Sequence, residues 1–179
     1  MARMARSILL TAVLAATIVA SPAAPAAGGD ADVWAELRPL AGKWKGEGLG
    51  FGAVADVTHE WEFVLQSRFL RLRTRSVQRG ENGEVHEDIG FVSRDTGSGT
   101  FVFRQFLSEG FVNTFDLAVQ TGDTLTITFE PRAFESTGSM RARMELTLES
   151  ADAYAMTLAL AGPGKEFVTC QQMRMTRVP

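Results

Sequence analysis

Hydrophobic and polar residues alternate with a period of two along much of the chain. In the stretch VTHEWEFVLQ, residues 57–66, the even positions are mostly polar, and the odd positions are Val57, His59, Trp61, Phe63 and Leu65. This alternation predicts a β-strand with one buried face. His59 is therefore expected on the apolar face, between a valine and a tryptophan.

Ten segments have the pattern or composition of strands. We expect strands at approximately 43–50, 54–66, 68–79, 84–94, 100–108, 110–121, 124–131, 139–149, 153–161 and 165–178. Turn-forming sequences separate them, and Asn82-Gly83 is the strongest hairpin signal because both residues accept positive φ angles. Sequential strands without helical spacers imply an up-and-down antiparallel sheet, and closure removes its exposed edges. The expected fold class is all-β: a single antiparallel barrel of about 8–10 strands.

The segment before the first strand predicts a short N-terminal helix. Val33, Trp34, Leu37 and Leu40 have helical spacing, with Asp32 as the N-cap, and Pro39 and Gly42 end the segment. This helix is expected to cover one end of the barrel.

The first 27 residues have the organisation of a secretory signal peptide. Arg3 and Arg6 precede an apolar run from Ile8 to Ala20, and Ala24-Pro25-Ala26 fits a small-residue cleavage site. The apolar run has 13 residues, too few for a transmembrane helix. We expect a removed signal peptide at 1–27, a flexible segment at 28–32 and a barrel domain at 33–179. The mature protein is then periplasmic or secreted.

The net charge bears on possible partners, and the cysteine count bears on what holds the fold together. Without residues 1–27, 16 basic and 21 acidic residues remain, giving a formal charge of −5. An acidic chain offers no electrostatic reason to bind nucleic acid. The only cysteine is Cys170, so an intramolecular disulfide is impossible and packing must hold the fold.

Alternation also defines an expected inner face, which is aromatic and rich in methionine. Its members are Trp44, Val57, His59, Trp61, Phe63, Ile89, Phe91, Phe101, Phe103, Gln105, Phe111, Phe115, Leu117, Leu125, Ile127, Phe129, Met140, Met144, Leu146, Leu148, Tyr154, Met156, Leu158, Phe167 and Met173. Such a lining suits either a packed core or the wall of an apolar ligand site.

Three polar residues on this face are candidates for orienting a ligand. His59 is either a neutral imidazole hydrogen-bonded to a backbone carbonyl, Asn113 or Gln105, or a donor facing a ligand. Gln105 and Asn113 flank a turn on adjacent strands and suit a polar ligand group or buried water. The candidate ligand-binding residues are His59, Trp61, Phe63, Phe103, Gln105, Asn113 and Tyr154.

Other charged residues are interpreted as surface features. Arg71, Arg73, Arg75 and Arg79 share one face of a strand, most simply the solvated one, with an internal arginine that holds a carboxylate as the alternative. His86, Glu87 and Asp88 predict a solvated hairpin arm or a weak surface metal site. Neither histidine completes a His-Glu-x-x-His motif, and there is no serine-nucleophile elbow or phosphate loop. We therefore expect no enzyme activity and no metal site.

The stretch LRPLAGKWKGEG places a Gly-x-Trp motif at the opening of the first strand, after the short helix. It resembles the calycin superfamily of lipocalins, fatty-acid-binding proteins and nitrobindin-like haem-binding barrels. QSRFLRLRTRS, EDIGFVSRDTGSGTFVFRQFLSEGFVNTF and AGPGKEFVTCQQMRMTRV are similar to nitrobindin-like and related bacterial barrels. The resemblance covers nearly the whole mature chain, and implies a barrel floor closed by Trp44 and a last strand ending in a basic residue.

The resemblance also raises the question of haem. Nitrobindin-like proteins bind haem through a histidine near the end of the barrel, whereas residues 87–179 of this chain contain no histidine. Their haem site therefore cannot be transferred residue by residue, although His59 is an alternative axial ligand. The leading hypothesis is an exported, non-catalytic barrel without a cofactor that binds a lipid-like apolar or amphipathic molecule. The alternatives are a haem-binding barrel and a filled structural or protein-interaction barrel.

Overall fold

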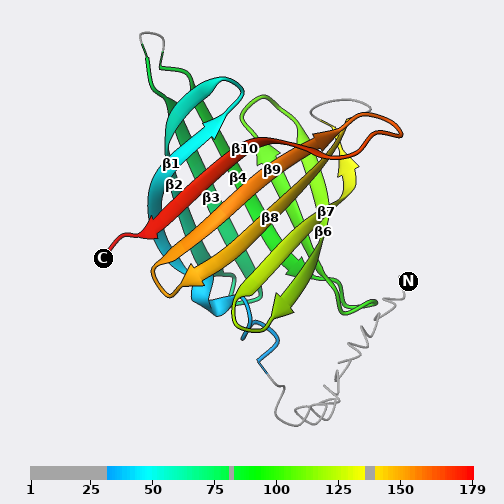
Figure 1. Ribbon diagram of the computed structural model, residues 1–179. Coiled ribbons are helices and arrows are strands. Elements are labelled where there is room, and N and C mark those ends of the chain that lie inside the picture. The colour runs from blue at the N-terminus through cyan, green and yellow to red at the C-terminus, as the bar shows by residue number, and fades with distance from the viewer. Residues whose placement is uncertain (1–31, 81–82, 136–139) are drawn as a thin grey trace, which may run out of the picture. The chain divides into compact units, whose positions relative to one another are not determined.

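The computed structural model describes residues 32–80, 83–135 and 140–179 (Figure 1). The expected signal peptide, most of the segment at 28–32 and Asn82 of the hairpin signal lie outside these residues. The elements of the barrel unit, Val33–Pro179, are η1 (Arg38–Leu40), β1 (Gly42–Gly50), β2 (Ala53–Val64), β3 (Phe69–Gln78), β4 (Val85–Arg94), β5 (Phe101–Leu107), β6 (Val112–Thr121), β7 (Leu125–Phe134), β8 (Arg141–Ser150), β9 (Ala153–Ala161) and β10 (Val168–Arg177).

The ten strands form one closed antiparallel barrel. Each strand pairs with its neighbours in the sequence, and β1 pairs with β10 to close the sheet. The seam runs from Trp44, opposite Arg177, to Gly50, opposite Gln171. The predicted fold class is confirmed, with strand boundaries close to those expected from alternation and turn residues.

The N-terminal helical segment is shorter and tighter than an α-helix. Trp34, Leu37 and Leu40 are buried at intervals of three residues, which is the period of a 3₁₀-helix. Leu37 N–H and Arg38 N–H both donate to the carbonyl of Trp34. No helix within the described residues is long and apolar enough to cross a membrane.

Aromatic and aliphatic packing fills the barrel end next to η1, which we call the closed end. Trp34 contacts Phe63 and Phe101, with ring centroids 5.6 and 5.1 Å apart. Trp44 donates its indole N–H to the carbonyl of Leu40 over 2.8 Å, and its ring lies 4.7 Å from that of Tyr154. These contacts place Trp44 on the barrel floor and attach η1 to it.

The predicted inner face is wrong in β4. His86, Asp88, Gly90 and Val92 face inward, whereas Ile89 is 40% exposed and Phe91 lies on its outer side. A Cβ on Gly90 would lie 2.1 Å from the ring of Phe103. The ring of Phe103, whose register partner is Val92, therefore requires a glycine at the diagonal position 90, and this fixes which face of β4 points inward.

Two further aromatic residues are not inside the barrel. Phe111 precedes β6 and is 38% exposed. Phe167 precedes β10 and packs beneath two guanidinium groups, those of Arg141 at 4.9 Å and Arg143 at 4.3 Å from the ring centroid. Cation–π contact, rather than core burial, accounts for this position.

Candidate ligand-binding cavity

The barrel is hollow at the end opposite η1, which we call the open end. A cavity of about 470 Å³ extends inward from the β1–β2 and β3–β4 connections. Its floor consists of Leu72, Phe103, Phe115 and Phe129. Its lining also includes Phe51, Glu84, Val85 and Glu109, which are exposed, so the cavity opens to solvent.

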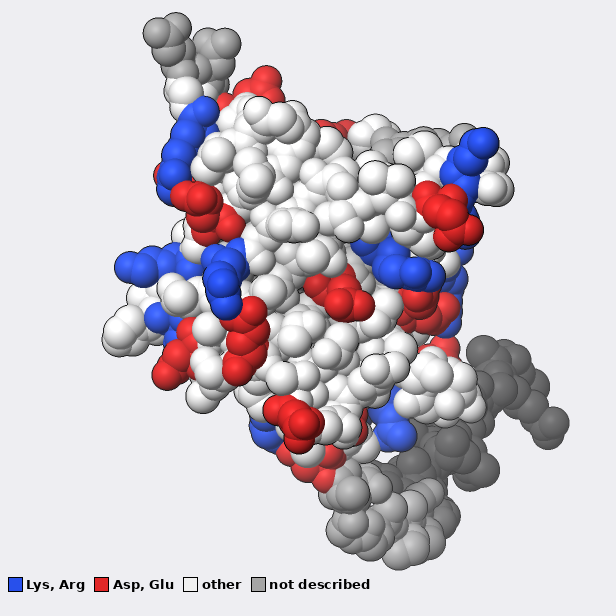
Figure 2. Space-filling view, viewed as in Figure 1, with Lys and Arg blue, Asp and Glu red and all other residues white. Residues whose placement is uncertain are grey.

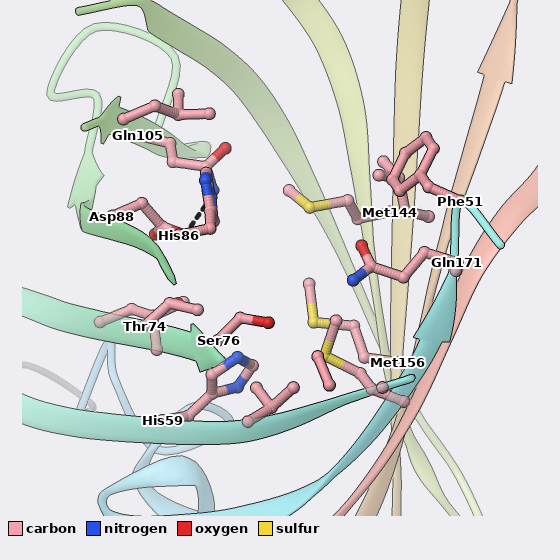
Figure 3. Close-up of a pocket in the computed structure, with 18 of the residues that line it drawn as sticks. Phe51, His59, Thr74, Ser76, His86, Asp88, Gln105, Met144, Met156 and Gln171 are labelled. Carbon is pink, nitrogen blue, oxygen red and sulfur yellow. Dashed lines mark ion pairs between the residues drawn. The ribbon is translucent and has the colours of Figure 1, made fainter. Parts of the chain in front are cut away.

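The cavity has one polar wall and one apolar wall, which face each other in Figure 3. Strands β3 to β6 and the β5–β6 connection supply the polar wall, whose members are Thr74, Ser76, Gln78, His86, Asp88, Gln105, Glu109 and Asn113. Strands β2, β8, β9 and β10 supply most of the apolar wall, with Ala53, Ala55, Val57, Met144, Met156, Leu158, Leu160 and Met173. Gln171 is a polar member on this second side. Such a division suits a molecule with one polar end and one apolar body.

His59 lies deep on the cavity wall and is 3% exposed. Its Nδ1 is 2.5 Å from the hydroxyl of Tyr154 on β9. Burial lowers the pKa of His59 to about 4, and Asp88 opposes that shift. The imidazole is therefore neutral at pH 7. Among the described residues Nε2 has no hydrogen-bond partner.

Burial also raises the pKa of Tyr154, so its hydroxyl keeps its proton at neutral pH. That hydroxyl can donate to Nδ1 of His59, which leaves a proton on Nε2 for donation into the cavity. In the other tautomer Nδ1 donates to Tyr154 and Nε2 is an acceptor. The sequence predicts a backbone carbonyl, Asn113 or Gln105 as the partner of His59; the actual partner is Tyr154, from a strand 95 residues away in the sequence.

A second polar group lies nearer the open end. His86 Nδ1 is 2.7 Å from a carboxylate oxygen of Glu109, and its Nε2 is 3.6 Å from Oδ2 of Asp88. The neighbouring carboxylates of Asp88 and Glu109 raise the pKa of His86 to about 9. His86 is therefore a cation at pH 7, held between two carboxylates.

Asp88 is the most deeply buried acid of the polar wall. Its side chain is only 4% exposed, and Oδ1 is buried without a hydrogen-bond partner. An unpaired buried carboxylate oxygen is costly, because it has lost its water without gaining a donor. Asp88 is therefore a cavity-lining acid with one buried oxygen that no donor satisfies.

The arginines of β3, and Arg79 just after it, lie outside the cavity. Arg71 pairs with Glu62, Arg75 with Glu87, and Arg79 with Glu47 and Asp56. On the face seen in Figure 2, acidic and basic side chains likewise lie beside one another rather than in patches of one sign. The expectation of a solvated arginine face is confirmed, and no arginine or lysine belongs to the described lining of the cavity.

Four of the seven candidate ligand-binding residues line the cavity: His59, Phe103, Gln105 and Asn113. Gln105 and Asn113 are register partners, as expected, and Asn113 Oδ1 accepts from the backbone N–H of Glu135 at 3.1 Å. The other three, Trp61, Phe63 and Tyr154, lie beyond the lining in the packed core, and Tyr154 reaches the cavity only through His59.

Sequence reasoning missed the acidic part of the site. The sequence pattern assigns His86 and Asp88 to the surface, but they are inward neighbours of Ser76 and Thr74 on β3. The sequence signal that could have identified them is Gly90. It lies on the same face of the strand as His86 and Asp88, and a glycine is expected where a neighbouring side chain leaves no space. Among the described residues, no group of three or more His, Cys, Asp or Glu side chains could hold a metal ion.

Comparison with known proteins defines the class of fold. No protein-family model and no curated protein matches the chain. The solved structure of Rv2717c from M. tuberculosis is similar, with a TM-score of 0.68 and 15% identity, covering 83% of this chain and 99% of that one.

Two further solved structures are less similar to this chain. One is EF1p2_mFAP2b bound to DFHBI (TM-score 0.45, 12% identity, 80% and 97% of the two chains). The other is a de novo designed fluorescence-activating β-barrel (TM-score 0.40, 14% identity, 77% and 93%). At these identities the comparisons concern the fold, and only the first is close enough to support it. The chain is thus a closed ten-stranded antiparallel β-barrel, a fold that it shares with Rv2717c.

Proposed function

We propose that this protein is an exported, non-catalytic barrel that binds one small amphipathic molecule in its open end. The observation that carries the proposal is the cavity of about 470 Å³, with a methionine-rich wall opposite a polar one. Burial of apolar ligand surface against the first wall supplies affinity, and hydrogen bonds to the second wall orient the ligand.

The packed closed end supports this role. Trp44, Trp61 and Tyr154 are each at most 2% exposed and belong to the packed core at this end. A rigid base holds the open end in its binding shape before the ligand arrives, which lowers the entropic cost of association. The filled half argues against a long carrier channel through the whole barrel, and the hollow half argues against a purely structural barrel.

Export is part of the proposal and rests on the leader at residues 1–27. Expression of the full chain in a bacterial host with a secretion pathway, followed by fractionation, tests it directly. The mature protein is expected in the periplasm or medium, with an N-terminus near residue 28. Retention of the full-length chain in the cytoplasm would contradict export without affecting the binding proposal.

A haem-binding function fits the site poorly. His59 offers one imidazole nitrogen, but haem carries two carboxylates, and the described lining contains Glu84, Asp88 and Glu109 without an arginine or lysine. His86 is the only cation of that described lining, and its ring nitrogens already face Asp88 and Glu109. Haem is therefore not part of the proposed function.

A cavity-filling pair of variants tests the binding site. Ala55 lines the cavity on β2, and Ala118 lies exposed on β6. We expect Nile red, a neutral apolar dye, to fluoresce with the mature protein and with Ala118→Trp, but not with Ala55→Trp. Native mass spectrometry of the purified protein then searches for a retained ligand. Equal dye binding by a folded Ala55→Trp variant would refute the cavity as the site.

A further inference from the structure

Asp88 holds an unusual position for an acidic residue in a cavity lined by aromatic and methionine side chains. It projects inward from β4, and its Oδ1 atom is buried without any hydrogen-bond donor. Its other oxygen, Oδ2, lies 3.6 Å from Nε2 of His86. Among the described residues this carboxylate therefore has one ion pair, to His86, and no hydrogen bond.

The rest of the described lining contains no arginine or lysine that could donate a hydrogen bond to Asp88. It contains three carboxylates, those of Glu84, Asp88 and Glu109, and a single cation, the imidazolium of His86. Glu109 holds the other side of that imidazole at 2.7 Å. With His86 protonated, the cavity still carries an excess of negative charge.

This charge distribution discriminates between the possible polar ends of a ligand. A ligand carboxylate would meet two or three carboxylates without an arginine or lysine to neutralise it, at a high desolvation cost. A hydroxyl group could donate one hydrogen bond to Asp88. A protonated amine could do the same with a charge-assisted bond, which is about twice as strong as a neutral one.

We propose that the ligand is an amphipathic amine, whose ammonium group is received by the carboxylate of Asp88 in the cavity lining while its apolar body lies against the methionine wall. This inference rests on the proposed function and specifies its ligand class. Glu109 and Glu84 at the open end attract the cation. Gln105, whose amide has no protein partner among the described residues, is a further polar contact on the same wall.

The test compares three probes that share one alkyl chain: decylamine, decanol and decanoate. Each is titrated into the mature protein at neutral pH, below its micelle concentration, by isothermal titration calorimetry. We expect decylamine to bind at least about tenfold more tightly than decanoate, with decanol between them. Asp88→Asn should lower the affinity for decylamine about tenfold and leave that for decanol nearly unchanged.

The control variant is Glu87→Gln. It removes the same charge one residue away, on the outer face, where the side chain is 59% exposed. Its affinity for all three probes should match that of the unaltered protein. If Asp88→Asn does not fold, Glu109→Gln and the order of the three probes on the unaltered protein still decide the question.

The outcomes separate the two proposals. If none of the probes binds, the proposed binding function fails and the amine inference with it. If decanoate or decanol binds as tightly as decylamine, the cavity is a binding site but the amine assignment is overturned. If a folded Asp88→Asn variant keeps the full preference for decylamine, Asp88 is not the receiving group.

Discussion

The guanidinium of Arg177 lies over the indole of Trp44, 4.1 Å from the ring centroid, at the seam where β10 meets β1. The same group donates to the carbonyls of Ala41 and Pro39, each over 2.7 Å. One side chain therefore links the last strand, the first strand and the segment around η1. The floor of the barrel depends on this arrangement.

Replacement of Arg177 by alanine is expected to lower the free energy of unfolding by about 2–4 kcal/mol, since charge-assisted hydrogen bonds and a cation–π contact disappear together. Urea denaturation followed by tryptophan fluorescence measures the change. The matched control is Arg174→Ala, on the same strand but 74% exposed and paired with Glu149. It should cost at most about 0.5 kcal/mol. Equal losses in the two variants would contradict the role of Arg177.

Gly90→Ala is expected to destabilise the barrel by about 1–3 kcal/mol, because the added methyl group would overlap the ring of Phe103. Phe103→Leu in the Gly90→Ala background should restore part of that loss by making space. Thermal or urea unfolding of both single variants and the double variant gives the coupling. Simple additivity of the two effects would show that this contact does not determine the parity of β4.

The sequence was sufficient to predict the barrel because its strands carry a period of two and its turns carry glycine, aspartate and serine. Sequential hairpins left little choice of topology. The Gly-x-Trp motif correctly located Trp44 at the floor. Its contact with Arg177 joins residues at opposite ends of the barrel sequence, and β1–β10 closure makes them neighbours.

The site was predictable only in part, because β4 departs from the rule that apolar residues face inward. Phe91 packs against Phe106 on the outer face, with ring centroids 6.5 Å apart, while Asp88 and His86 face the cavity. The hydrophobic pattern assigns Ile89 and Phe91 to the core. It therefore predicts the wrong face of β4 as the inner one. Binding sites are where such patterns fail, because polar groups there serve a ligand rather than the fold.

Stability is expected to fall as the pH decreases from about 6.5 to about 4, in part because of His59. Its folded pKa is about 4, below the ordinary value of 6.5. In this interval the unfolded chain therefore binds a proton that the folded protein excludes, and the contribution is about 1.4 kcal/mol per pH unit at most. Urea unfolding across this range should give a shallower slope for His59→Gln and an unchanged slope for His86→Gln. A slope unaffected by His59→Gln would contradict a neutral buried imidazole.

His86 is expected to make stability depend on pH in the opposite direction, with a loss of stability as the pH rises. Its folded pKa is about 9, above the ordinary 6.5, so the folded protein keeps a proton that the unfolded chain has lost. Its contribution is fully present below about pH 6.5 and is lost as the pH rises through about 9. His86→Gln should flatten this alkaline decline, and His59→Gln should not. NMR titration of the His86 ring measures the pKa directly, and a value near 6.5 would rule out the pairing with Asp88 and Glu109.

Addition of hemin to the mature protein is expected to leave the absorption spectrum of free hemin unchanged. His59 is the only histidine that faces the deep cavity, and its Nε2 could reach a metal only in the tautomer in which Nδ1 donates to Tyr154. The acidic lining would also repel the haem carboxylates. A Soret shift at one equivalent that is lost in His59→Ala but retained in His86→Ala would overturn this expectation. It would assign His59 as an axial ligand and replace the amine proposal, because haem and an alkyl ammonium would compete for the same cavity.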